Sequence, residues 1–272
     1  MTRSSLGTAL VTGASFGIGA VYADRLAKRG YDLILVARNG ERLKSLASEL
    51  ASQTGRSVKP LVADLGDKAA LAKVEAVLRD DPSSTLLVNN AGSASLSPLL
   101  NSDIDQMEAM ITLNVTALTR LTYAAAPAFV ARGAGTIINI GSVVGIVPER
   151  LNGVYGASKA YVLALTQSLQ HEFGEKGVRV QAALPAPTAT DIWEKGGLHH
   201  SKLPAGTVMS TEDMVDAALA GLDQGEVVTI PPLQDGDDWA RFDAARVALA
   251  PKFMNSAPAP RYRTATPVRQ IA

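Results

Sequence analysis

Tyr155 and Lys159 stand four residues apart and could together handle a proton. They lie in an apolar-periodic segment, residues 155–173, that predicts a helix, so both side chains would project from one face, one turn apart. A free tyrosine has a pKa of about 10, and a nearby cation favours the phenolate and lowers that pKa. Such a phenol could give a proton to a substrate oxygen or take one from it. An isolated pair of this kind is more often a solvated helix face, so the rest of the chain decides the interpretation.

The composition bounds the class of protein. A chain of 272 residues, 47% of them hydrophobic, allows one large α/β domain or two small ones. The 26 basic residues equal the 26 acidic ones, so no nucleic-acid partner is expected. Cysteine is absent and there are three histidines, which disfavours a metal site. Since neither a signal-peptide pattern nor a membrane-spanning apolar stretch is present, we predict a cytoplasmic protein without a membrane partner.

Short apolar runs alternate with helical patterns along residues 8–230. This alternation predicts right-handed βαβ units and a parallel sheet. We therefore predict a single doubly wound, Rossmann-type α/β domain, with a seven-stranded, mainly parallel sheet and helices on both faces. A helix over 103–132 should bend or break at Pro127, which lacks a backbone N–H. The expected strands are 8–12, 33–37, 58–63, 85–88, 136–140, 178–184 and 227–230, and the other expected helices are 20–29, 41–52, 68–79, 154–173, 211–223 and one near 239–250.

Gly13, Gly17 and Gly19 are spaced as G-x3-G-x-G between a predicted strand and a predicted helix. Glycine permits a tight turn and lets backbone N–H groups approach a pyrophosphate, at a helix N-terminus that favours negative charge. The spacing departs from the usual G-x-G-x-x-G, and an ordinary strand–helix turn is the alternative. Its position near the N-terminus favours nucleotide binding.

The second predicted strand is followed by Arg38, and no acid occupies residues 37–39. An acid there would hold the ribose 2′-hydroxyl of NAD, whereas an arginine accommodates the 2′-phosphate of NADP. The pattern therefore favours NADP over NAD, with Arg42 as a second cation; a strand-end arginine in solvent is the alternative. Asp64, after the third strand, could accept hydrogen bonds from an adenine amino group or cap the next helix.

Polar and small residues also follow the fourth and fifth strands. Because open parallel sheets bind ligands outside the carboxyl ends of their strands, the run at 89–92 could lie against a cofactor, with a polar turn as the alternative. Ser142 precedes Tyr155 by 13 residues, and its hydroxyl could bind a substrate carbonyl beside the phenol.

In their order and separations, these motifs resemble the short-chain dehydrogenase/reductase family, in its compact, NADP-preferring form. The likeness covers about residues 6–232. It rests on Gly13-x3-Gly17-x-Gly19, Asn89-Asn90-Ala91-Gly92, Asn114, Ser142, Tyr155-x3-Lys159 and Pro185.

The resemblance implies an NADP(H)-dependent oxidoreductase that reduces a carbonyl to an alcohol, or the reverse. Tyr155 would be the general acid and base. Lys159 would lower the tyrosine pKa and bind the nicotinamide ribose. Ser142 would orient the substrate carbonyl, and Asn114 would hold a water that links Lys159 to solvent.

The sequence departs from the family pattern at two places. Ala186 stands where the family has a glycine after Pro185, which restricts the backbone beside the nicotinamide. Phe16 occupies a loop position that is often small or basic, so the NADP preference rests on Arg38. The cofactor contacts that we predict are Gly13, Ser15, Phe16, Gly17, Ile18, Gly19, Arg38, Asp64, Leu65, Asn90, Ala91, Gly92, Tyr155, Lys159, Pro185, Thr188 and Thr190.

The substrate is expected to lie under an irregular segment, residues 186–210, that resembles a mobile lid. Its apolar residues favour a small to medium hydrophobic carbonyl or alcohol, although Trp193 could instead pack in a subunit interface. The predicted substrate contacts are Ser142, Val144, Tyr155 and Trp193.

The resemblance also implies a homodimer or homotetramer, formed through the helices at 103–132 and 154–173. We predict that residues 1–232 form the NADP-binding and catalytic domain. Residues 233–272 would extend the same domain, with an end whose Pro, Ala and Arg content is compatible with mobility.

Two other functions remain open. One is an NAD-preferring alcohol dehydrogenase of the same family, and the other is a non-enzymatic protein that senses the cofactor. A sensor would be expected to lose the acid or its lysine, whereas Asn114, Ser142, Tyr155 and Lys159 are all present.

Overall fold

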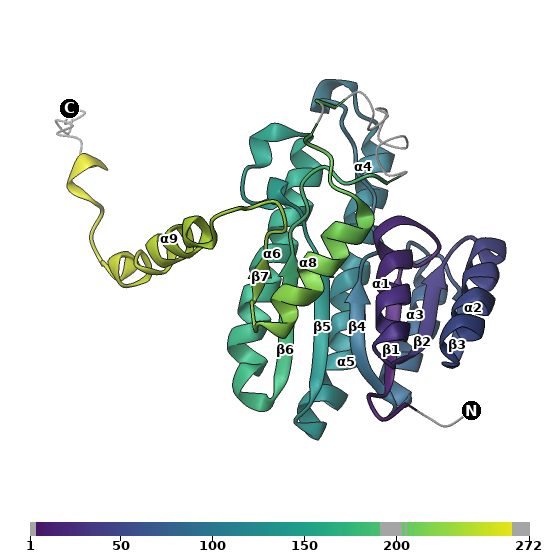
Figure 1. Ribbon diagram of the computed structural model, residues 1–272. Helices are drawn as coiled ribbons and strands as arrows, with labels where there is room; N and C mark the ends of the chain where they lie inside the picture. Colours follow the sequence, from purple (N-terminus) through teal and green to yellow (C-terminus); the bar gives the residue numbers. More distant parts are fainter. Residues whose placement is uncertain (1–3, 191–202, 205, 263–272) are drawn as a thin grey trace, which may run out of the picture. The chain divides into compact units, whose positions relative to one another are not determined.

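The computed structural model describes residues 4–190, 203–204 and 206–262. Seven strands form one sheet in the order β3-β2-β1-β4-β5-β6-β7, and each pair of neighbours is parallel (Figure 1). The strands are β1 (Thr8–Thr12), β2 (Asp32–Ala37), β3 (Val58–Val62), β4 (Ser84–Asn89), β5 (Gly135–Ile140), β6 (Val178–Ala183) and β7 (Val228–Thr229).

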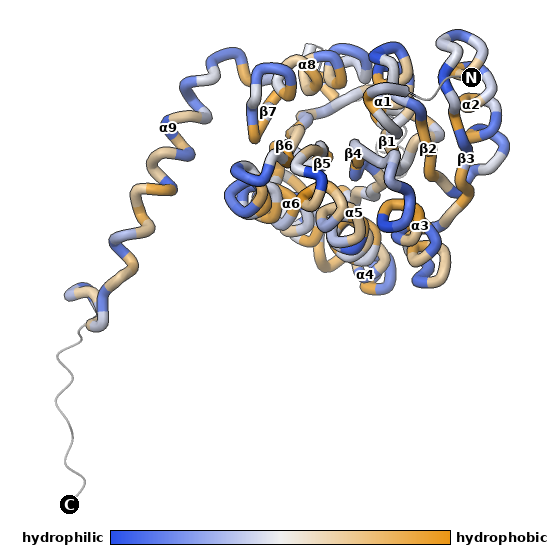
Figure 2. Tube along the Cα trace, turned by 90° about the horizontal axis from the view of Figure 1, so that it is seen from below, coloured by the Kyte–Doolittle hydropathy of each residue, from blue (hydrophilic) through white to orange (hydrophobic). Residues whose placement is uncertain are grey.

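Helices cover both faces of the sheet (Figure 2). One face carries α1 (Gly17–Lys28), α2 (Gly40–Thr54) and α8 (Thr211–Asp223). The other carries α3 (Lys68–Asp80), α5 (Leu118–Arg132) and α6 (Gly153–Phe173). The predicted doubly wound, Rossmann-type α/β fold is confirmed.

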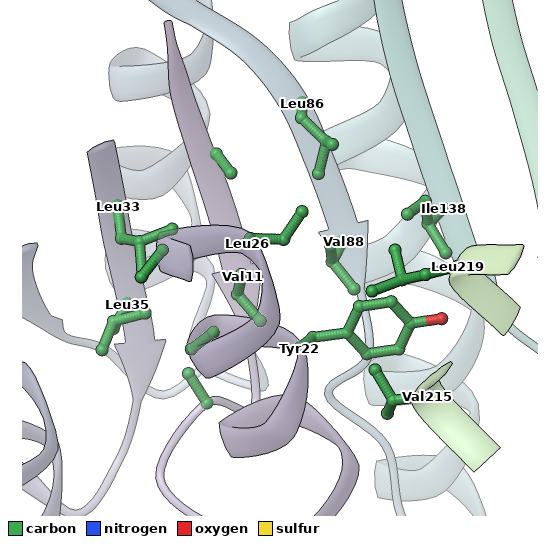
Figure 3. Close-up of a cluster of buried hydrophobic side chains, with 14 of the residues drawn as sticks. Val11, Tyr22, Leu26, Leu33, Leu35, Leu86, Val88, Ile138, Val215 and Leu219 are labelled. Atoms are coloured by element: carbon green, nitrogen blue, oxygen red, sulfur yellow. The ribbon is translucent and has the colours of Figure 1, made fainter. Parts of the chain in front are cut away.

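The central strands are apolar throughout because helices bury both of their faces. Successive side chains of a strand point to opposite faces, so Val11 and Leu35 join the core under α1, whereas Leu10 and Ile34 join the core under α3 and α5. Figure 3 shows the first core, where the ring of Tyr22 from α1 packs among side chains of the sheet and of α8.

The segment predicted as one helix over 103–132 has an irregularity, but not at the predicted place. It comprises α4 (Ile104–Ile111), a π-helical turn η2 (Thr112–Ala117) and α5. Pro127 lies inside α5, so the predicted break there is wrong, and the alternative of a bend stays a prediction. Ala125 and Phe129, which lie on either side of Pro127 in α5, are buried in the core against the sheet. This packing offsets the hydrogen bond that proline cannot make.

The two edge strands are shorter than predicted. β3 carries Pro60, which an edge strand tolerates, and it ends at Val62 rather than at residue 63. β7 has only two residues, because Pro231 and Pro232, which follow closely, have no N–H to pair with a neighbour.

The chain divides into two units, Met1–Pro232 and Leu233–Ala272. The second unit contains α9 (Gly236–Val247), followed by 3-10 turns at Ala250–Phe253 and Pro260–Tyr262. The predicted helix near 239–250 thus begins and ends three residues earlier, because the Asp235 side chain caps it by accepting from the N–H of Asp237. Within the described residues, no helix combines the length and the apolar character that crossing a membrane requires.

Candidate active site

A cavity of about 1230 Å³ runs along the carboxyl ends of β1, β2, β4, β5 and β6. Nearly every predicted cofactor or substrate residue that the structure describes lines it. The predicted residues at its wall are Gly13, Ser15, Phe16, Gly17, Ile18, Arg38, Asp64, Leu65, Asn90, Ala91, Gly92, Ser142, Val144, Tyr155, Lys159, Pro185, Thr188 and Thr190.

The glycine turn between β1 and α1 forms one end of the cavity. Gly13 has φ +64°, in the left-handed region that favours glycine. A Cβ atom on Gly19 would collide with the carbonyl oxygen of Gly13, so only glycine at this position allows the turn to stay closed. Gly19 does not line the cavity, and its predicted contact with a cofactor stays a prediction. The N-cap residue of α1 is Phe16, whose side chain makes no capping hydrogen bond, and the N-terminus of a helix presents backbone donors suited to a diphosphate.

The turn after β4 is tied to the glycine turn. Asn90 Nδ2 donates to the carbonyl oxygens of Thr12 (2.9 Å) and Gly13 (3.2 Å). The Thr12 hydroxyl accepts from the backbone N–H groups of Asn90 and Ala91. The role of Thr12 was missed, because a threonine at the end of a strand has no distinctive sequence signature.

Arg38 and Asp64 lie near each other at the same end, with side chains that are 70% and 52% exposed. Arg38 Nη1 is 3.8 Å from Asp64 Oδ2. Asp64 Oδ1 accepts from the N–H of Gly66 (2.9 Å), whereas the cap of α3 is Asp67. The alternative that Asp64 caps the next helix is therefore wrong.

At the other end of the cavity Ser142, Tyr155 and Lys159 are all buried. Lys159 Nζ lies 5.9 Å from the centre of the Tyr155 ring and donates to the carbonyl oxygen of Ile140 (2.9 Å). Ser142 follows β5 and donates to the carbonyl oxygen of Pro185 (3.3 Å). The structure thus brings together the hydroxyl, phenol and ammonium that the motifs predicted to act jointly.

Burial controls the protonation of this group. It raises the pKa of the Tyr155 phenol, and a hydrogen bond with Ser142 lowers that pKa in part. It also lowers the pKa of Lys159 to about 8. The predicted lowering of the tyrosine pKa by Lys159 is not seen, because desolvation dominates and the ammonium is directed at Ile140.

Asn114 lies in the π-helical turn and is buried behind the cavity wall. Its Oδ1 accepts from the N–H of Ser93 (2.9 Å). Its Nδ2 donates to the carbonyl oxygen of Ser93 (2.9 Å) and to Ser158 Oγ (3.1 Å), which itself donates to the carbonyl oxygen of Tyr155 (2.8 Å). Both amide hydrogens are therefore used, and the side chain ties the exit of β4 to α6. The predicted water link from Asn114 to Lys159 stays a prediction.

Asn152 fixes the start of α6, which carries Tyr155. Its Oδ1 accepts from the N–H groups of Val154 (2.9 Å) and Tyr155 (3.2 Å), and its Nδ2 donates to the carbonyl oxygen of Ser97 (2.6 Å). This residue was also missed, although an asparagine just before a helical pattern is a recognised cap signal.

The predicted lid is described only in part. Trp193 and most of the segment 186–210 lie outside the described residues. A parallel bridge joins Thr188 to Met209. Thr190 lies beside the glycine turn, with its Cγ2 3.2 Å from where a Cβ on Gly17 would stand.

The family model for short chain dehydrogenases matches residues 7–199. The chain belongs to the short chain dehydrogenase family. The predicted resemblance is confirmed, and the protein is an oxidoreductase. An uncharacterized oxidoreductase of Staphylococcus epidermidis is 32% identical over 223 residues, which cover 82% of this chain and 93% of that protein.

Two solved structures match the chain over most of its length. One, a short-chain dehydrogenase from Sphingobium yanoikuyae in complex with NADPH, is 49% identical with a TM-score of 0.92, covering 94% of this chain and 100% of that one. The other, a bulky-bulky ketone specific alcohol dehydrogenase from Comamonas testosteroni, is 43% identical with a TM-score of 0.87, covering 95% and 99%.

Proposed function

We propose that this short-chain dehydrogenase uses NADP(H) to interconvert a carbonyl and an alcohol on a small to medium, hydrophobic substrate. The observation that carries the proposal is one cavity with a glycine turn and Arg38 at one end and Ser142, Tyr155 and Lys159 at the other. The solved relative in complex with NADPH supports the proposed cofactor, and the relative specific for ketones supports the proposed reaction.

The residues at the wall fit this cofactor. The glycine turn, the N-terminus of α1 and Thr190 would take the diphosphate. Arg38 would take the 2′-phosphate, Asp64 the adenine and Lys159 the nicotinamide ribose. When bound, the nicotinamide supplies a hydride to the substrate carbon, or accepts one from it.

The buried residues manage the proton. In reduction, Tyr155 donates its phenolic proton to the substrate oxygen as the carbon gains the hydride, and oxidation reverses both transfers. Because burial raises the pKa of Tyr155, the phenol stays protonated at neutral pH, as a general acid requires. The Ser142 hydroxyl would orient the substrate oxygen, and the Lys159 ammonium would stabilise the phenolate that remains after proton transfer.

The test is NADPH oxidation with aryl, steroid, β-ketoacyl and small aliphatic ketones, for the wild type and Tyr155→Phe. We expect turnover with at least one class and a loss of about 10²–10⁴ in kcat for the variant. Its Kd for NADPH, from nucleotide fluorescence, should change less than about twofold. A variant that keeps most of its rate would show that another residue is the acid. Failure of every ketone class would favour the cofactor sensor.

We also propose that residues 1–232 form the NADP-binding and catalytic domain of a cytoplasmic homodimer or homotetramer, which residues 233–272 extend. All described residues that line the cavity lie in the first unit. Exposed Tyr123 on α5 and Tyr161 on α6 support packing of these helices against a second copy. Light scattering should give two or four times the mass of the chain; a monomer would contradict this part of the proposal.

A further inference from the structure

Two methionines of α4, Met107 and Met110, form part of the cavity wall. They are 4% and 3% exposed, and they belong to one buried cluster with Val144 and Tyr155. The wall therefore continues directly into the side chain that is proposed to protonate the substrate.

The same helix face positions both the wall and a catalytic candidate. Met107, Met110 and Asn114 are spaced at i, i+3 and i+7, so they follow one stripe of the helical segment. Because Asn114 is held by hydrogen bonds to Ser93 and Ser158, this stripe is fixed toward the start of α6.

The described part of the cavity wall beside the methionines carries no charged side chain apart from Lys159. The charged side chains of the described cavity wall are Arg38, Arg42, Asp64 and Lys159. The first three lie at the dinucleotide end, and Lys159 belongs to the catalytic group. Around the methionines the cluster adds Ala94, Leu151 and Val154, which are uncharged and apolar. A charged substituent held against this wall would lose its hydration, with no charged partner on α4 at the wall to offset the loss.

We propose that Met107 and Met110 determine which ketones this enzyme accepts, and that its substrates are uncharged ketones with bulky apolar groups. The inference rests on the carbonyl reduction proposed above. Methionine is unbranched, has three rotatable side-chain bonds and makes favourable contacts with aromatic rings. A pair of them next to small Ala94 forms an apolar wall that can rearrange around substituents of different size.

The experiment compares kcat/KM for a diaryl ketone with kcat/KM for the corresponding aryl methyl ketone, with NADPH. Met110→Phe places a larger, stiffer side chain at the wall and reduces the space for a bulky substituent. The ratio of kcat/KM for the diaryl ketone to that for the methyl ketone should therefore fall by about tenfold or more. Met107→Ala and Met110→Ala open the wall, so the ratio should rise by about tenfold. The alanine variants keep the test decisive if the phenylalanine variant does not fold.

Met214 provides the matched control. It is a fully buried methionine on α8, in the core under α1, and it does not line the cavity. Met214→Ala should lose stability and keep the ratio within about twofold, and Kd for NADPH should stay unchanged in the α4 variants.

Three outcomes would overturn the inference. If the α4 variants are active and their ratio of diaryl to methyl ketone kcat/KM does not change, Met107 and Met110 do not determine specificity. Carbonyl reduction would still stand. If the wild type reduces only small or charged keto compounds, the proposed class of bulky, uncharged ketones is wrong, but carbonyl reduction still stands. If none of the ketones supports NADPH oxidation by the wild type, the proposed function itself is wrong.

Discussion

The two ends of the cavity are constructed differently. At the dinucleotide end the backbone sets the shape, through the closed glycine turn, and the charged side chains of Arg38 and Asp64 lie in solvent. At the catalytic end the working groups are buried side chains held by hydrogen bonds. Since water screens exposed charges and burial strengthens electrostatic effects, backbone changes at the first end and polar changes at the second should be the most damaging.

Gly19→Ala should have the largest effect, because the new Cβ would meet backbone atoms that cannot move aside. We expect a loss of up to about 3 kcal/mol in the free energy of unfolding and a Kd for NADPH raised by more than about tenfold. Urea unfolding and fluorescence titration measure the two. Gly153→Ala is the control, since nothing lies within 4 Å of its Cβ position. Equal behaviour of the two variants would mean that the turn is not closely packed.

Ser142→Ala should lower kcat by about 10²-fold while Kd for NADPH stays within about twofold. Because the hydrogen bond with Ser142 lowers the pKa of Tyr155, its loss raises that pKa further. The alkaline limb of the pH–rate profile for reduction should therefore move to higher pH. Ser142→Thr keeps the hydroxyl and should recover part of the rate; a threonine variant as slow as the alanine variant would contradict the assigned role.

Lys159→Met tests the buried ammonium through the pH dependence of stability. The pKa of Lys159 is about 8 in the folded chain, against 10.5 ordinarily. Between these values the unfolded chain binds more protons than the folded one, so this group makes stability rise with pH. The free energy of unfolding of the wild type relative to Lys159→Met should rise by on the order of 2 kcal/mol from about pH 7 to about pH 10. A pH-independent difference in urea unfolding would show that the pKa is ordinary.

Arg38→Ala should have the smallest effect, because its side chain is mostly exposed. We expect Kd for NADPH to rise by about tenfold and Kd for NADH to change less than about threefold. Added salt should reduce the difference between the two cofactors in the wild type. Equal losses for NADPH and NADH would mean that Arg38 does not contact a 2′-phosphate.

Much of the fold could be predicted because local patterns agree with it. β1 and β2 are continuous apolar runs beside clear helical patterns, and such runs need burial on both faces. The edges were less predictable, since the length of β3 and β7 depends on what pairs with them. The π-helical turn at Thr112–Ala117 had no signal, because those residues are compatible with an ordinary helix.

For the site, the motifs predicted which residues meet but not their environment. The direction in which the Lys159 ammonium points, and hence the tyrosine pKa, depends on the carbonyl of Ile140 and on burial, which no spacing encodes. Ser93 was missed because it bonds Asn114 through its backbone, and Thr12 because its hydroxyl bonds the backbone of Asn90. Neither role leaves a sequence signature, since serine and threonine are common in loops. The close approach of Gly19 to Gly13 and Asn90 was not predicted, since the packing of one turn against another has no local pattern.

The π-helical turn has a consequence for how this protein can change over evolutionary time. Deleting one residue between Thr112 and Ala117 would let the backbone return to regular α-helical hydrogen bonding, with little local cost. Because each residue of a π-helical turn rotates the chain by less than the roughly 100° of an α-helical residue, α4 and α5 would keep nearly the same relative orientation. Functional descendants should therefore tolerate the loss of one residue from this turn more readily than a loss inside α4 or α5, where the two sides would rotate by about 100° against each other.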